Sequence, residues 1–144
     1  MLIAVAVQGM IRMRDDMIAA AGGHRLGSVD AISALGVSYV TFAEREQGVF
    51  RLMFGLTKDH EETPEMMEAG RACYAVLLGQ VGAFHGLAAD HPEVPPLAFP
   101  LWTMVHGTSF LIIDGKVDVA DLVVDIPTMI RNSTEALMRP RTTA

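Results

Sequence analysis

The sequence predicts an all-α fold: a six-helix, bundle-like domain whose last two helices pair with those of a second copy. Apolar residues recur at three- and four-residue intervals along several long stretches. No stretch alternates apolar and polar positions with β-branched residues over the length of a strand. At 144 residues the chain is long enough for one domain with a full core and needs no disulfide or metal to fold. Its hydrophobic share of 51% is high for a small monomer, so the excess apolar surface requires a partner subunit, a ligand cavity or a lipid bilayer.

The first half of the chain predicts two long helices and a short one. The first covers Leu2 to Ala21, because its apolar residues follow a helical stripe that stops at a glycine pair. Ser28 is a suitable N-cap for a second helix that runs to about Glu46. A short aromatic-rich helix, Val49 to Gly55, follows a break at Gln47-Gly48.

The second half predicts three further helices. Thr63, followed by a proline, caps a fourth helix that lasts until about Ala89. A proline-containing loop separates it from a fifth helix, Leu97 to Ile113. The sixth runs from about Val119 to Met138, and we expect Pro127 to kink it.

The fifth helix predicts a homodimer because it is apolar around its whole circumference. A helix without a polar side is buried on every side, and the penultimate helix of a small domain has too few neighbours for that. Pairing with a second copy solves the problem by forming an intersubunit four-helix bundle with the sixth helix. The residues that we assign to this dimer interface are Val105, Ile112, Leu122, Ile126 and Ile130.

Charge and motif content exclude several classes of function. The net charge of -6, without a block of basic residues, predicts repulsion from nucleic-acid phosphates. The single cysteine, Cys73, excludes an intrachain disulfide and a cysteine-based zinc site, and it suits the cytoplasm. Asp59, His60, Glu61 and Glu62 are consecutive, which indicates a solvated loop and not a metal site. With no phosphate loop or nucleophile elbow, we expect no catalytic residue, metal or cofactor.

Several fragments resemble the C-terminal domain of TetR-type transcriptional regulators in order and spacing. The most similar subgroup is named WHG after a Trp, a His and a Gly, which here are Trp102, His106 and Gly107. The resemblance extends from about Leu2 to Met138. The fragments that carry it are Phe42-Ala43, Phe50 to Gly55, Leu101 to Gly107 and Asp114-Gly115.

This resemblance implies a ligand-sensing and dimerisation domain, residues 1–144, in which the last two long helices pair across a dimer. It also implies a cavity among the earlier helices that binds a small molecule and thereby changes the spacing of two DNA-binding heads. The first helix would transmit that change. The resemblance implies that a three-helix DNA-binding head should precede Leu2, where only Met1 stands. The alternatives are that the chain is a fragment, a cleaved product or a paralogue without the head. We expect DNA contact only through such a head.

The expected effector is a small apolar or aromatic molecule, because ten methionines indicate soft, adaptable surfaces. Trp102, His106 and Phe110 share one helix face, where His106 could anchor the effector, although a structural hydrogen-bond partner is the favoured role for this residue. For any single candidate, ordinary core packing is the simpler alternative. The candidate ligand-binding residues are Tyr39, Phe42, Phe50, Met53, Phe54, Met66, Tyr74, Leu77, Leu78, Trp102, His106 and Phe110.

The leading hypothesis is therefore the non-enzymatic, effector-binding part of a cytoplasmic TetR-type repressor. A small membrane-associated helical protein is one alternative, because Ala72 to Ala89 and Leu97 to Ile113 carry no charged residue. Polar residues interrupt both stretches, so we expect no membrane span. A helical-bundle enzyme is the other alternative, and it requires titratable groups that the fold alone would cluster.

Overall fold

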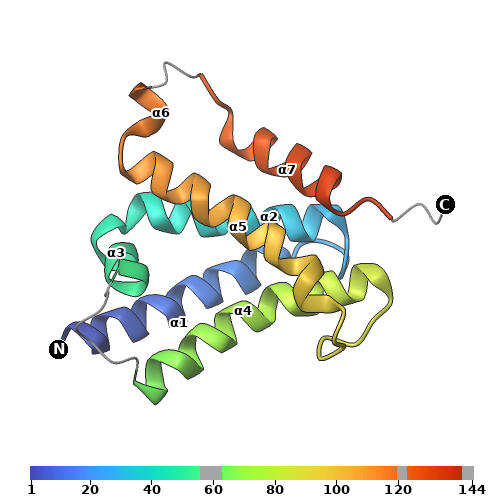
Figure 1. Ribbon diagram of the computed structural model, residues 1–144, viewed down its shortest axis with the longest axis horizontal. Helices are drawn as coiled ribbons and strands as arrows, with labels where there is room; N and C mark the ends of the chain where they lie inside the picture. The colour runs from blue at the N-terminus through green and yellow to red at the C-terminus, as the bar shows by residue number, and fades with distance from the viewer. Residues whose placement is uncertain (56–62, 120–122, 141–144) are drawn as a thin grey trace.

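The computed structural model describes residues 1–55, 63–119 and 123–140, and it confirms the all-α prediction (Figure 1). Every regular element in these ranges is an α-helix. The helices are α1 (Leu2–Ala21), α2 (Val29–Arg45), α3 (Gln47–Gly55), α4 (Pro64–His85), α5 (Val94–Ile113), α6 (Lys116–Val119) and α7 (Ile126–Leu137).

Capping residues begin the helices where the sequence predicts. The Ser28 hydroxyl accepts a hydrogen bond from the Ala31 backbone N–H at 3.0 Å at the start of α2. The Thr63 hydroxyl accepts from the Met66 N–H at 3.3 Å at the start of α4. Helix α4 ends four residues earlier than predicted, at His85, because Gly86 adopts a left-handed conformation (φ 68°) and terminates it.

Two proline positions correct the sequence-based boundaries. Helix α5 begins at Val94, so the following Pro95-Pro96 pair occupies its first turn and not a loop. The predicted single helix from Val119 to Met138 is wrong, because residues 123–125 are not helical and α7 begins only at Ile126, while residues 120–122 lie outside the described residues. Pro127 lies in the first turn of α7, where no backbone N–H is needed, and therefore starts a helix instead of kinking one.

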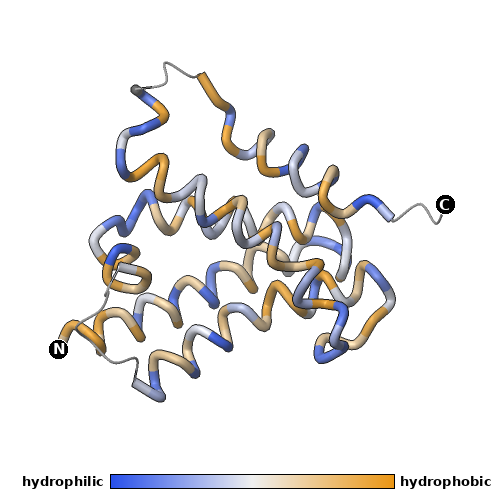
Figure 2. The backbone as a smooth tube through the Cα atoms, in the orientation of Figure 1, coloured by the Kyte–Doolittle hydropathy of each residue, from blue (hydrophilic) through white to orange (hydrophobic). Residues whose placement is uncertain are grey.

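Helix α2 is the central element, since it packs against α1, α3, α4, α5 and α7. Gly36 permits α5 and α7 to approach α2 closely. A Cβ atom at this position would lie 2.8 Å from the Ile130 side chain of α7 and 3.1 Å from the Val105 side chain of α5. Hydrophobic and hydrophilic residues alternate along the surrounding helices, as expected of helices that bury one side (Figure 2).

Helix α5 buries only one side within the subunit. Its buried residues repeat every three to four positions, whereas Phe99 and Leu111 on the opposite side are 56% and 54% exposed. Among the described residues, α5 is the one helix with the length and hydropathy to cross a membrane, and 28% of its most apolar window is buried. The prediction of an apolar helix that the subunit alone does not cover is therefore confirmed.

The conformation of the turn between α1 and α2 predicts that a substitution at Gly27 destabilises the fold. Gly27 has a φ of 71°, and a Cβ atom there would lie 2.7 Å from backbone atoms of α4. Its N–H also donates to the Gln80 side chain at 2.7 Å. We expect Gly27→Ala to lower the free energy of unfolding by at least about 1–2 kcal/mol, because left-handed backbone alone costs that much for alanine.

Urea denaturation would measure this loss. Gly23→Ala is the matched control, since Gly23 lies in the same connection and a Cβ atom there would have nothing within 4 Å. Equal stability of the two variants would show that the close approach at Gly27 does not constrain the fold.

Candidate functional site: an apolar cavity between the helices

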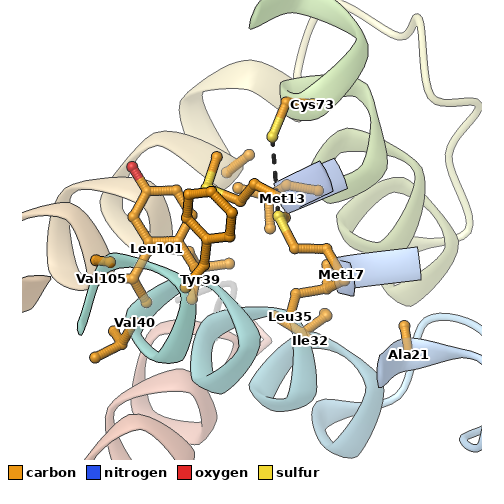
Figure 3. Packing of buried hydrophobic residues seen from close by; sticks show 14 of the residues in the cluster. Met13, Met17, Ala21, Ile32, Leu35, Tyr39, Val40, Cys73, Leu101 and Val105 are labelled. Carbon is orange, nitrogen blue, oxygen red and sulfur yellow. Dashed lines mark hydrogen bonds between the residues drawn. The ribbon is translucent and has the colours of Figure 1, made fainter. Parts of the chain in front are cut away.

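A cavity of about 400 Å³ lies at the centre of the subunit. Its size is within the range of roughly 300–1,000 Å³ that is usual for small-molecule sites. Side chains from α1, α2, α4 and α5 converge in this region (Figure 3). The lining residues are Met10, Met13, Met17, Ile32, Leu35, Gly36, Tyr39, Met53, Phe54, Met66, Met67, Gly70, Arg71, Cys73, Tyr74, Leu77, Leu101, Trp102, Met104, Val105 and Thr134.

Methionine is the dominant component of the wall. Seven of the ten methionines in the chain line the cavity. Met10, Met13 and Met17 come from one stripe of α1 and are buried. Because an unbranched thioether side chain adapts to different shapes, such a wall can accommodate apolar ligands of varied outline.

A hydrogen-bond chain joins α2 to α5 beside the cavity. The Trp102 indole N–H donates to the Tyr39 hydroxyl oxygen at 3.3 Å, and the same hydroxyl lies 2.6 Å from His106 Nδ1. Burial raises the pKa of Tyr39 well above its ordinary value, so the phenol keeps its proton and can donate it to His106. All three polar groups therefore have partners within the subunit.

Burial also lowers the pKa of His106, which favours the neutral imidazole that accepts from Tyr39. The ring lies among Phe54 at 4.7 Å, Phe110 at 5.0 Å and Phe50 at 5.9 Å between centroids. His106 has a structural partner in Tyr39 and is not among the residues that line the cavity. Its position matches the structural role that the sequence analysis favoured.

The Cys73 thiol forms part of the cavity wall. Its Sγ lies 3.9 Å from the Met17 Sδ (Figure 3). Burial raises the pKa of Cys73 to about 11, so the group stays a thiol at neutral pH and lacks the reactivity of a thiolate. Cys73 thus contributes a small apolar surface to the cavity.

The structure brings most of the predicted ligand-binding residues to this cavity. Those that line it are Tyr39, Met53, Phe54, Met66, Tyr74, Leu77 and Trp102. Phe42 and Phe50 are fully buried in the core and His106 packs in the aromatic cluster, while Leu78 and Phe110 are partly buried against the core. These five do not line the cavity.

The predicted dimer-interface residues lie mostly on the inner sides of their helices. Val105 and Ile130 are buried within one subunit, where they face Gly36 of α2. Ile112 and Ile126 are partly buried against the same core. Leu122 lies outside the described residues. Other residues of α5 therefore form its exposed side.

Sequence reasoning missed the contribution of α1 to the cavity. The spacing of Met10, Met13 and Met17 within the apolar stripe of this helix places three flexible side chains on one helix face. That clustering is a signal that sequence analysis could have used. No comparable signal exists for Arg71 or Thr134, which reach the cavity only because of how α4 and α7 pack.

The helical fold surrounds an apolar cavity of a size that suits a small molecule. The family described as "Tetracyclin repressor-like, C-terminal domain" matches residues 32–132, so the chain belongs to this family of TetR-type regulator domains. No curated protein matches the chain.

A solved structure supports the same fold. It is described as a protein with unknown function from Rhodococcus sp. RHA1, and it superposes with a TM-score of 0.80 at 19% sequence identity. The similarity covers 95% of this chain and 70% of that chain. At this level of identity the comparison bears on the fold alone.

The environment of His106 predicts how the stability of the protein depends on pH. Its pKa is below the ordinary 6.5 in the folded state, so between the two values the unfolded chain binds the additional proton. The contribution of His106 to stability is therefore complete above about pH 6.5 and decreases as the pH falls through that value towards the folded-state pKa. We expect the stability advantage of the wild type over His106→Asn to be smaller at about pH 5.5 than at about pH 8.

Urea denaturation of both proteins at the two pH values would measure this difference. His106→Asn is the appropriate variant because its amide oxygen can accept from Tyr39 but does not titrate. An advantage that grows at the lower pH would mean that the folded protein holds His106 protonated.

Proposed function

We propose that this chain is the effector-binding and dimerisation domain of a TetR-type transcriptional repressor and works in the cytoplasm. Residues 1–144 would act as one unit, and a small apolar or aromatic molecule would be the effector. The observation that carries the proposal is the apolar cavity of about 400 Å³ in a chain of this family. Membership of a regulatory family favours ligand sensing over catalysis.

Effector binding would regulate DNA binding through thermodynamic linkage. An effector that prefers one arrangement of the helices shifts the population towards that arrangement, by no more than its difference in affinity for the two states. Helix α1 supplies three methionines to the cavity and begins at Leu2. In a regulator that carries a DNA-binding head before α1, a shift of this helix would change the position of the head.

The exposed side of α5 supports dimerisation. It carries Phe99, Thr103, Gly107 and Leu111 at four-residue intervals, and none of these side chains is charged. The Thr103 hydroxyl donates to the Phe99 carbonyl of its own helix at 2.9 Å, so it needs no outside partner. Gly107 has nothing within 4 Å of its Cβ position in the subunit, which leaves room for a second helix to approach closely.

The cavity can be tested with a variant that fills it. Gly70 lines the cavity, and a Cβ there would meet only the Met10 Sδ, at 3.9 Å. We expect Gly70→Leu to fold but to lose binding of small apolar and aromatic compounds. Trp102, the single tryptophan, lines the cavity, so its fluorescence together with the melting temperature reports binding directly.

Gly79→Leu is the control for this experiment, since Gly79 is on the same helix, does not line the cavity and has nothing within 4 Å. It should keep the ligand-induced shift of the wild type. A broad compound screen with no effect on the wild-type melting temperature or fluorescence would overturn the effector-binding proposal.

The dimer can be tested with a charge placed at Gly107. Because the subunit leaves this position open, Gly107→Arg should fold normally, whereas a long cation would obstruct the approach of a second α5. We expect the wild type to be a dimer and the variant a monomer, as measured by light scattering coupled to size exclusion.

Gly48→Arg makes the same chemical change at an exposed position of α3, which also has nothing within 4 Å. It should remain dimeric. A wild type that is monomeric and stays in solution without detergent would contradict the assigned interface. A wild type that requires detergent would instead favour a membrane role for α5.

A further inference from the structure

Apart from the Thr134 hydroxyl and the Cys73 thiol, the polar groups of the cavity wall divide into two sets. Tyr39 and Trp102 are hydrogen-bonded to each other, and Tyr39 is also hydrogen-bonded to His106. These groups therefore have little hydrogen-bonding capacity left for a ligand. Arg71 and Tyr74 form the second set. Among the residues that the structure describes, neither their guanidinium nor their phenol group has a hydrogen-bond or ion-pair partner.

In the described part of the chain, Arg71 is the only charged residue that lines the cavity, and no described aspartate or glutamate lines it. The described part of the wall therefore carries a positive charge, opposite in sign to the net charge of -6 of the chain. An apolar cavity with one cation favours a ligand that carries one negative charge. A cationic ligand would meet a like charge, and a dianion would keep a charge without a partner.

The position of Arg71 defines where the charged end of a ligand would lie. Met13 at the inner end of the cavity is 1% exposed, whereas Met67 is 40% exposed and Arg71, one turn further along α4, is also exposed. Arg71 and Met67 therefore mark the open side. Here a guanidinium can stay solvated while its stem lies along the apolar wall.

Tyr74 adds a second hydrogen-bond donor to the cavity wall. It lies three residues after Arg71, on the same side of α4, and its ring packs against Trp102 with centroids 5.5 Å apart. Burial raises the pKa of Tyr74, so its phenol stays protonated and can donate a hydrogen bond. A guanidinium and a phenol on adjacent turns suit the two oxygens of a carboxylate.

We propose that the effector is an amphipathic carboxylate, with an apolar body among the methionines and its carboxylate held by Arg71 and Tyr74 at the open side of the cavity. The inference rests on the proposed effector-binding function and specifies its ligand class. Arg71 would set the preference for an anion, while the methionine wall would bind the apolar body. The charge and the apolar body of the ligand therefore contribute separately to its affinity, and each contribution can be removed without the other.

Octanoate and octanamide test this separation, because they share one alkyl chain and differ in headgroup charge. Their affinities for the full chain would be measured by Trp102 fluorescence and calorimetry. The wild type should bind octanoate about fivefold or more tightly than octanamide, the scale expected of a partly exposed ion pair, and added salt should reduce the ratio. Arg71→Met should abolish the preference, because it should weaken octanoate binding far more than octanamide binding. Arg71→Lys should keep most of the preference for octanoate over octanamide.

Arg25→Met is the control, since Arg25 is exposed in the connection after α1, does not line the cavity and makes the same change in net charge. Equal wild-type affinities for the two compounds, or equal losses for both in Arg71→Met, would overturn the carboxylate inference and leave the effector-binding proposal intact. Absence of octanoate binding would also overturn it. The broad compound screen then decides separately whether the cavity binds any ligand.

Discussion

The arrangement of this subunit depends on the hydrogen bonds of the Tyr39 hydroxyl group. A phenol in the core has to satisfy its hydrogen-bonding capacity within the protein, because water is excluded. Tyr39 does so by accepting from Trp102 and bonding to His106, both on α5. These two bonds fix the rotation of α5 against the central helix α2, and the rotation decides which residues of α5 face inwards.

Two features of the molecule follow from that rotation. Trp102 and Leu101 become part of a cavity wall to which methionine contributes more residues than any other residue type. At the same time, Phe99, Gly107 and Leu111 turn away from the subunit and form an apolar surface without charged groups. The two hydrogen bonds of Tyr39 thus give α5 an inner side that faces the cavity and an outer side that the subunit leaves exposed.

The charge distribution adds chemical selectivity to the cavity. The wall is largely apolar, and α4 places Arg71 and Tyr74 in it. A partly buried, neutral His106 and a thiol at Cys73 add no charge to the interior. The membership in the TetR-type regulator family identifies the class of protein, whereas the position of one guanidinium suggests which kind of molecule such a regulator would sense.

The sequence by itself determined the helical class, the caps at Ser28 and Thr63, and the apolar character of α5, because local hydrogen bonds and periodicity decide these features. It also indicated seven of the residues that line the cavity. Only the tertiary structure decided that Val105 and Ile130 face Gly36 inside the subunit, since helix rotation depends on contacts far apart in the chain. The placement of Arg71 has the same origin: its neighbours in sequence do not reveal that α4 turns it towards a cavity.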